Sequence, residues 1–316
     1  THKVMIVAGE ASGDLHGGNL VKEMRRIAPG TTFYGVGGGR MRQEGVELLA
    51  DAADMAVVGL TEVVFKLGTI LGAMRRLKAS FTTARPDLVV LIDYPDFNLP
   101  LARAARRRGI KVLYYISPQV WAWRKGRIDT IRKTVDRMAV ILPFEEEFYR
   151  GAGVDVSFVG HPLLDEVKPR YPRQEAMKRY GIRDEAITVA ILPGSRQSEV
   201  TRILPEMLGA CRILTEKLSP LQFLLPLAPT VDSAGVWDIL RQFPLKVNIV
   251  RDEMSDVVAA SDVAIVASGT ATLETALLET PMVVVYKVSA LSYAIGRRFI
   301  SVDHISLVNI IAGRTV

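Results

Sequence analysis

The sequence predicts an α/β protein made of two Rossmann-like, doubly wound domains that face a cleft. Short apolar runs rich in β-branched residues alternate with stretches of helical periodicity along the 316 residues. Such runs, bounded by turn residues, are typical of buried parallel strands. The alternation is interrupted between residues 168 and 173, where two prolines lie among charged residues. We therefore expect one domain over residues 1–168 and a second over residues 169–316.

The composition fits a protein that folds around its own hydrophobic core in a reducing compartment. Hydrophobic residues make up 49% of the chain, and Cys211 is the single cysteine, which excludes a disulfide framework. The first apolar run follows directly on the first three residues. No apolar run approaches the ~18 residues that a membrane-spanning helix needs. We therefore expect a cytoplasmic protein without a signal peptide.

The net charge of +6, from 40 Lys and Arg against 34 acidic residues, favours an anionic partner. A nucleotide, a nucleic acid and an acidic membrane surface would each fit this charge. Aromatic and basic residues are not interleaved as they are on a nucleic-acid-binding platform. We therefore expect no nucleic-acid partner.

In the first half of the chain, strands are predicted at residues 4–8, 32–36, 88–92, 112–116, 138–142 and 156–159. The first strand runs into a small, flexible turn at residues 9–14 that opens a helix. Gly13 and Gly18 have the spacing of a P-loop, but the Lys and the Ser or Thr of that motif are missing. Glu10 and Asp14 would also repel a diphosphate. We expect the turn to contact sugar hydroxyls, and a tight strand–helix turn with Asp14 near the helix start is the alternative.

Polar and aromatic side chains follow two of the later strands in this half. Asp93 comes immediately after the strand at residues 88–92, where α/β proteins bind ligands, so it is a candidate general base. Asp96 is instead expected to cap the helix that begins near Phe97. Trp121 and Trp123 lie in the loop after the next strand. They either stack on a sugar or line an acyl groove, or they simply pack in the core.

The stretch at residues 60–81 predicts an amphipathic helix with a broad apolar face. Its apolar residues follow helical spacing, and its polar positions carry four basic residues and one acidic residue, Glu62. A basic, strongly apolar helix of this kind can lie in a membrane interface. A helix that packs in the core of the domain is the equally weighted alternative.

In the second half of the chain, strands are predicted at residues 187–192, 221–226, 246–250, 263–267 and 282–286. The first of these strands ends in Pro193, Gly194 and Ser195, and a helix follows from about residue 198. Such a connection directs free N–H groups and the positive end of a helix at one point, which favours an anion. Arg196 adds a guanidinium group that can bind two phosphate oxygens at once. An ordinary connection with Arg196 salt-bridged at the surface is the alternative.

A second candidate for phosphate binding follows the strand at residues 263–267. Ser268, Gly269 and Thr270 offer two hydroxyl groups and a close backbone approach at the start of a helix. Glu274 follows one turn later on the same face as Thr270, within reach of a ribose hydroxyl. Two anion-binding turns at neighbouring strand ends are more specific than either turn alone, and together they favour nucleotide binding.

The metal-binding patterns that nucleotide-sugar enzymes often carry are missing from the sequence. There is no Asp-x-Asp pair, no His-Glu-x-x-His motif and no cysteine cluster. We therefore expect neither a metal site nor a cofactor. The charge on a diphosphate leaving group would then be stabilised by helix N-termini, hydroxyl groups and arginine.

Eight motifs, in this order along the chain, resemble those of one enzyme family. They are AGEASGD at 8–14, DYPDFN at 93–98, SPQVWAWR at 117–124, LPFE at 142–145, VGHP at 159–162, LPGSR at 192–196, ASGTATLE at 267–274 and SLVNIIAGR at 306–314. Together they resemble the lipid-A-disaccharide synthases, inverting glycosyltransferases of the two-domain fold called GT-B. The resemblance covers the whole chain. It implies transfer of 2,3-diacylglucosamine from a UDP-linked donor to 2,3-diacylglucosamine 1-phosphate, with a β-1,6-linked disaccharide 1-phosphate and UDP as products.

The resemblance also implies roles for individual residues. Asp93 matches the family's essential aspartate and would deprotonate the acceptor 6-hydroxyl, and Glu10 and Ser12 match residues of the N-terminal site turn. On the donor side the matching residues are Arg196 with its neighbour Ser195, the diphosphate ligands Ser268, Gly269 and Thr270, the ribose ligand Glu274 and the C-terminal Asn309. Family members continue beyond residue 316, so we expect C-terminal helices to be missing here.

Because both implied substrates are acylated, the resemblance favours the membrane interpretation of residues 60–81. We expect peripheral binding to the anionic cytoplasmic face of the inner membrane. The sequence does not decide whether the protein forms a homodimer. Two other functions stay open as alternatives. One is a UDP-sugar 2-epimerase-like enzyme on the same two-domain plan, and the other is a non-catalytic, nucleotide-binding membrane adaptor.

Overall fold

The computed structural model describes residues 2–55, 60–121, 125–251, 253–287 and 306–315, with the backbone alone for residues 60–66 and 125. The chain forms two compact units, Thr1–Pro162 (unit 1) and Leu163–Val316 (unit 2). The predicted division lay after residue 168, so the short stretch at 163–168 belongs to unit 2.

Unit 1 is built on a parallel sheet of seven strands in the order β3-β2-β1-β4-β5-β6-β7. Their bounds are Lys3–Ala8 (β1), Thr32–Gly37 (β2), Glu47–Asp51 (β3), Leu88–Ile92 (β4), Lys111–Tyr115 (β5), Arg137–Val140 (β6) and Val156–Phe158 (β7). The sequence predicted each of these except β3. This strand lies at the edge of the sheet with its side chains partly exposed, and its sequence ELLAD carries no β-branched residue that would mark a strand.

Helices cover both faces of this sheet, because alternate side chains of each strand enter different cores. On β1, Val4 and Ile6 pack with residues of α1 (Ala11–Ile27) and α2 (Gly39–Gln43). Met5 and Val7 pack into the opposite core. That core is completed by residues of α3 (Ala52–Met55), α4 (Leu60–Thr83), α5 (Pro95–Arg106), α6 (Ile128–Thr134) and α7 (Pro143–Gly151).

Helix α4 combines a core-facing side with an exposed apolar side. Ala73, Leu77 and Phe81 are buried in the core of unit 1. Leu67 and Leu71, one turn apart, are 48% and 45% exposed. The side chains of residues 60–66, on which much of the predicted apolar face falls, lie outside the described residues. The second half of α4 therefore packs in the core, and the exposed Leu67 and Leu71 lie just before it.

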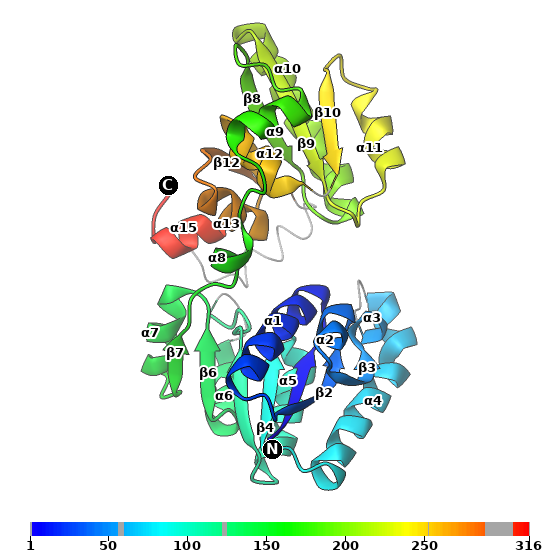
Figure 1. The fold of residues 1–316 in the computed structure, drawn as a ribbon, viewed down its shortest axis with the longest axis vertical. Helices are drawn as coiled ribbons and strands as arrows, with labels where there is room; N and C mark the ends of the chain where they lie inside the picture. The colour runs from blue at the N-terminus through cyan, green and yellow to red at the C-terminus, as the bar shows by residue number, and fades with distance from the viewer. Residues whose placement is uncertain (1, 56–59, 122–124, 252, 288–305, 316) are drawn as a thin grey trace. The chain divides into compact units, whose positions relative to one another are not determined.

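Unit 2 contains a parallel sheet of five strands in the order β10-β9-β8-β11-β12. The strands are Ile187–Leu192 (β8), Leu221–Leu227 (β9), Val247–Arg251 (β10), Val263–Ala267 (β11) and Met282–Val285 (β12), all of which the sequence predicted. The helices described here are Leu163–Glu166 (α8), Arg173–Tyr180 (α9), Gln197–Lys217 (α10), Ser233–Leu240 (α11), Met254–Ala260 (α12), Thr270–Leu277 (α13) and Leu307–Ala312 (α15). Figure 1 shows both units as sheets flanked by helices.

The strand orders mark where each unit should bind a ligand. In unit 1 the chain leaves β1 toward β2 on one side and returns to β4 on the other. In unit 2 the same reversal separates β8 from β11. Doubly wound sheets bind ligands beyond the carboxyl ends of the strands at such switch points. The turns after β1 and β4, and those after β8 and β11, are therefore the positions to inspect.

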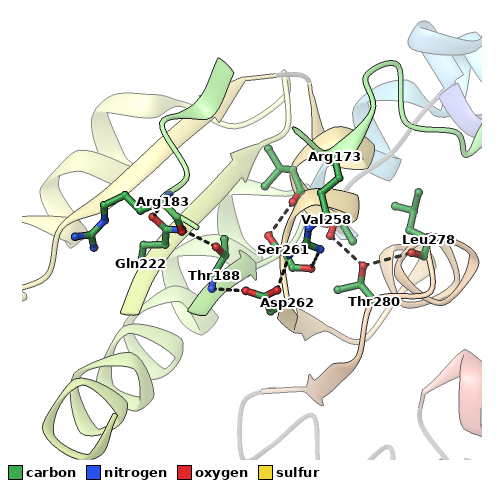
Figure 2. Close-up of polar contacts among 10 residues, drawn as sticks. Arg173, Arg183, Thr188, Gln222, Val258, Ser261, Asp262, Leu278 and Thr280 are labelled. Carbon is green, nitrogen blue, oxygen red and sulfur yellow. Dashed lines mark hydrogen bonds and ion pairs between the residues drawn. The ribbon is translucent and has the colours of Figure 1, made fainter. Parts of the chain in front are cut away.

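At the other end of the second sheet, where its strands begin, polar contacts join neighbouring segments (Figure 2). Asp262, just before β11, accepts hydrogen bonds from the Thr188 N–H at 2.9 Å and from Arg173 Nη2 at 2.6 Å. Gln222 Nε2 donates to Thr188 Oγ1 at 2.6 Å. Thr280 Oγ1 donates to the carbonyl oxygen of Val258 at 2.9 Å. These bonds stabilise the amino ends of the strands, whereas ligands are expected beyond their carboxyl ends.

Candidate active site

The first candidate site lies at the switch point of unit 1. Strands β1 and β4 are neighbours with Ala8 paired to Ile92, so the turns that follow them lie next to one another. These turns carry Glu10 and Asp93, and the charge of Glu10 acts on the Asp93 carboxyl. Ser12 lies exposed in the first turn of α1. The structure therefore brings together two of the predicted residues, Glu10 and Asp93, from distant parts of the sequence.

The environment of Asp93 shifts its acidity toward neutrality. Burial of the carboxyl is the main cause and the nearby Glu10 charge the next, and together they raise the pKa of Asp93 to about 6, against a smaller opposing effect of a hydrogen bond from the Tyr94 N–H. Such a carboxylate is ionised at pH 7 and a stronger base than an ordinary aspartate. A general base works best when its pKa lies near the operating pH.

The backbone that carries Asp93 is strained. Asp93 and Tyr94 have φ of 43° and 45°, in the left-handed region that residues with a side chain seldom adopt. Each such residue costs on the order of 1–3 kcal/mol and persists only where its surroundings hold it there. The Tyr94 ring lies directly against Gly9, where an added Cβ would come within 2.3 Å of a ring carbon. Gly9 is therefore required by this contact, which ties the turn after β1 to the turn after β4.

Asp14, which the sequence placed in the same turn as Glu10, has a structural role. Its buried carboxylate accepts hydrogen bonds from the N–H groups of Gly38, Arg40 and Met41 at 2.6, 2.9 and 3.0 Å. These are the free donors at the start of α2, so Asp14 caps that helix from α1. Asp14 therefore has the structural role that was the alternative to sugar binding. Of the two acidic residues in this turn, only Glu10 is exposed.

Two further predictions about this region can be compared with the structure. The prediction that Asp96 caps a helix is wrong, because α5 begins at Pro95 after Tyr94, and Asp96 lies inside its first turn in an ion pair with Arg127. Trp121 is buried, and its Nε1–H donates to Glu145 Oε1 at 3.1 Å. Packing therefore accounts for Trp121. Trp123 lies outside the described residues.

The second candidate site is a pocket of about 850 Å³ within unit 2. It lies beyond the carboxyl ends of β8, β9 and β11 and is bordered by the first residues of α10, α12 and α13. The volume is that of a typical small-molecule site. Helix starts direct unpaired N–H groups and partial positive charge inward, so the pocket suits an anion. Six predicted donor-side residues line it, namely Ser195, Arg196, Ser268, Gly269, Thr270 and Glu274.

Glu199 shapes the loop that presents Arg196. Its Oε1 accepts a hydrogen bond from Arg196 Nη1 at 3.0 Å, while the Arg196 side chain is 70% exposed. Gly194 has a φ of 121°, and an added Cβ would come within 2.7 Å of Glu199 Oε2, so glycine is required there. Glu199 was not among the predicted site residues, although an acidic residue three positions after an arginine at a helix start is a recognisable signal.

The loop after β11 differs, because none of the described residues crowds its glycine. A Cβ added to Gly269 would meet no atom of the described residues within 4 Å, so these residues leave space beside this backbone. Farther into α13, burial and then the nearby Glu166 raise the pKa of Glu274. Glu166 and Glu274 both line the pocket. Glu166 was also missed, since only the fold brings α8 to this position.

Asp256 holds another part of the pocket wall. This carboxylate is 1% exposed and accepts hydrogen bonds from the N–H groups of Arg170 and Tyr171 at 2.5 and 3.2 Å, and from Arg170 Nε at 2.8 Å. It thereby fixes the segment before α9 against the start of α12. Asn309, in contrast, lies on α15, which packs against α13, and is not among the residues that line the pocket.

Within the described ranges, no group of three or more His, Cys, Asp or Glu side chains is placed to hold a metal ion. Within the same ranges, no helix has the length and apolar character to cross a membrane.

Two doubly wound parallel units define the GT-B fold, which glycosyltransferases and UDP-sugar epimerases share. The chain resembles a UDP-GlcNAc 2-epimerase from Neisseria meningitidis with a TM-score of 0.62 and 13% identity, over 98% of this chain and 90% of that one. A glycosyltransferase from Rickettsia africae gives a TM-score of 0.56 and 12% identity, over 90% and 79% of the two chains. At these identities the likeness establishes the fold alone.

Sequence comparison identifies the family within this class. A family model described as lipid-A-disaccharide synthetase matches residues 4–316. The lipid-A-disaccharide synthase of Syntrophus aciditrophicus is 64% identical over 99% of this chain and 82% of its own length, and that of Geobacter sulfurreducens is 51% identical over 100% and 82%. The chain belongs to the lipid-A-disaccharide synthase family and is a glycosyltransferase. The family match favours glycosyl transfer over the epimerase and adaptor alternatives.

Proposed function

We propose that this glycosyltransferase joins UDP-2,3-diacylglucosamine to 2,3-diacylglucosamine 1-phosphate and releases UDP. The observation that carries the proposal is the unit 2 pocket, where the starts of α10, α12 and α13 border one cavity beside Arg196. A UDP-sugar presents a diphosphate that such a cavity can hold without a metal ion.

On the donor side, the diphosphate lies between the loops after β8 and β11. Arg196 and the helix N-termini neutralise the charge that develops on UDP as the glycosidic bond breaks. Ser195, Ser268 and Thr270 offer hydroxyl groups, and the open space beside Gly269 admits a phosphate oxygen close to the backbone. Glu274 accepts hydrogen bonds from the ribose hydroxyls. We assign Asn309 a lesser part, because it stands off the pocket wall.

On the acceptor side, Asp93 removes the proton from the 6-hydroxyl of the acceptor sugar. The oxygen attacks the anomeric carbon of the donor in line with the bond to UDP, and the configuration at that carbon inverts. The pKa of about 6 suits this step. Glu10 raises the basicity of Asp93 through its charge, and we propose that Ser12 contacts the sugars in the same turn.

Product analysis tests the reaction. The enzyme is incubated with both acylated substrates in a buffer that contains a chelator, and disaccharide and UDP are followed. We expect a β-1,6-linked disaccharide and UDP in equal amounts, and none of either with an acceptor that lacks the 6-hydroxyl. Conversion of the donor into a 2-epimer without acceptor would instead favour the epimerase function. Strong inhibition by the chelator would contradict the metal-free scheme.

We further propose that unit 1 binds the cytoplasmic face of the membrane through α4. Leu67 and Leu71 are exposed, and Arg75 and Arg76 follow on the same helix with exposed side chains. Apolar side chains flanked by cations suit an interface with anionic lipids. Both proposed substrates carry acyl chains, so binding at a bilayer would bring the enzyme to them.

Vesicle binding tests this surface. Changing Leu67 and Leu71 to Ser should weaken binding to anionic vesicles about 30-fold or more, since about 1 kcal/mol or more of burial is lost per leucine. Ile213 and Leu218 of unit 2 are the matched control, because they are 49% and 48% exposed. Their replacement by Ser should leave vesicle binding unchanged. An equal loss in both pairs, or in neither, would refute the assignment to α4.

A further inference from the structure

We propose that Tyr114 and Asn98 are positioning residues that keep the Asp93 carboxylate aimed for proton transfer. They do so by holding the main-chain carbonyl of Asp93, and with it the left-handed turn at residues 93–94. This inference rests on the proposed role of Asp93 as the base. It goes beyond that role by assigning a task to two residues that are fully buried in unit 1.

The carbonyl oxygen of Asp93 accepts hydrogen bonds from two side chains. Tyr114 Oη donates to it at 2.5 Å, and Asn98 Nδ2 donates to it at 2.8 Å. Asn98 Nδ2 also donates to the carbonyl oxygen of Ile92 at 3.1 Å. A carbonyl oxygen accepts two hydrogen bonds, so its capacity is filled. On the other side of the residue, the Asp93 N–H donates to the carbonyl oxygen of Ile116 at 3.2 Å.

The two donors come from rigid parts of the fold. Tyr114 lies on β5, the strand next to β4, and Asn98 lies in the first turns of α5. Both side chains are 0% exposed. A rotation of the Asp93 peptide out of its strained conformation would break these bonds inside the core, where no water replaces them. The turn is therefore held by the sheet and the helix together, as a strained site requires.

Simple packing does not explain these residue types. A phenylalanine would fill the core at residue 114 without a hydroxyl group that needs a partner. Asn98 Oδ1 has no hydrogen-bond partner among the described residues, so this amide is kept in the core although its acceptor side is unsatisfied. Its donor side makes the bonds to Ile92 and Asp93. Burial and the Asp93 charge raise the pKa of Tyr114 well above its usual value, so its hydroxyl stays a donor.

The test compares Tyr114→Phe with Tyr149→Phe. Tyr149 is also 0% exposed, and its Oη bonds to Ser117 Oγ at 2.7 Å rather than to Asp93. Each change removes one buried hydroxyl group and keeps the ring. We expect the two variants to lose similar amounts of thermal stability. In Tyr114→Phe, kcat should fall about tenfold or more with little change in KM, whereas Tyr149→Phe should keep the kcat of the unaltered enzyme.

The pH dependence of kcat is a second measurement, which a change in stability alone would not alter. Once the turn relaxes, the Asp93 carboxyl becomes better hydrated and its pKa falls toward the ordinary value. The acidic limb of kcat should therefore move to lower pH in Tyr114→Phe and stay in place in Tyr149→Phe. Equal kcat values and unmoved limbs in both variants would overturn the inference. Asn98→Leu should repeat the Tyr114→Phe result if it folds, and the conclusion does not depend on it.

Asp93→Asn separates this inference from the proposed function. If Asp93→Asn keeps full activity, Asp93 is not the base and both proposals fail. If Asp93→Asn is inactive while Tyr114→Phe behaves like Tyr149→Phe, only the positioning role fails. In the Asp93→Asn background, adding Tyr114→Phe should lower the residual rate no further, because the group being aimed is gone.

Discussion

The Asp93 turn and the Arg196 loop are built in opposite ways. Both follow a parallel strand at a switch point, β4 in unit 1 and β8 in unit 2. Asp93 is partly buried in left-handed backbone that Tyr114 and Asn98 hold from the core. Arg196 has extended backbone at the start of α10, a side chain that is 70% exposed and an ion pair with Glu199. A group that moves a proton is held rigidly, whereas a group that meets a polyanion stays open to solvent.

The largest effect should come from removing the rigid group. Asp93→Asn keeps the size of the side chain but cannot accept a proton, so kcat should fall about 10²–10⁴-fold. Asp96→Asn is the control in the same turn, because Asp96 is 72% exposed and pairs with Arg127. In the unaltered enzyme, kcat should rise with pH through about 6 as Asp93 loses its proton. A similar loss in both variants would show that the turn, rather than the Asp93 carboxylate, was damaged.

A smaller loss of activity should follow from removing the solvent-exposed Arg196 side chain. Arg196→Ala takes away a charge-assisted contact worth about 1.5–3 kcal/mol, so kcat/KM should fall about 10–150-fold. The helix N-termini would remain, which limits the loss. Arg202→Ala is the matched control, since Arg202 is exposed on the same helix and outside the pocket. If Arg196→Ala leaves the steady-state rate unchanged, Arg196 has no part in the mechanism.

The same contrast explains what the sequence could predict. The donor-side loops are local patterns, in which glycine and hydroxyl residues stand between a β-branched strand and a helix, and residues 194–196 and 268–270 do line one pocket. The strands are predictable for the same reason. Strand β3 was missed because its partly exposed edge position imposes no β-branched pattern. The roles of the site residues stay predictions.

The Asp93 geometry could not be predicted, because it depends on residues far away in sequence. The left-handed turn needs Tyr114 on β5, and the Tyr94 ring needs Gly9 after β1. No pattern around residue 93 announces either contact. The position of Asp93 after a strand was enough to identify a candidate base. The strained backbone of Asp93, its raised pKa and the hydrogen bonds that hold its carbonyl oxygen depend on the folded arrangement, in which β1, β4 and β5 lie side by side.

The two regions should also differ in stability. Because the folded-state pKa of Asp93 is raised from 3.8 to about 6, ionisation of this carboxyl destabilises the folded state progressively between about pH 4 and pH 6. Asp93→Asn removes that penalty, so its free energy of unfolding at pH 7 should exceed that of the unaltered protein by on the order of 3 kcal/mol. Below about pH 3 the difference should vanish, because the aspartate is then mostly protonated in both the folded and the unfolded state. Arg196→Ala loses only an exposed ion pair, and its free energy of unfolding should stay within about 1 kcal/mol of the unaltered protein at both pH values. Denaturant titrations at pH 7 and about pH 3 measure both variants, and an Asp93→Asn protein that is no more stable at pH 7 would mean that the ionised Asp93 does not destabilise the fold.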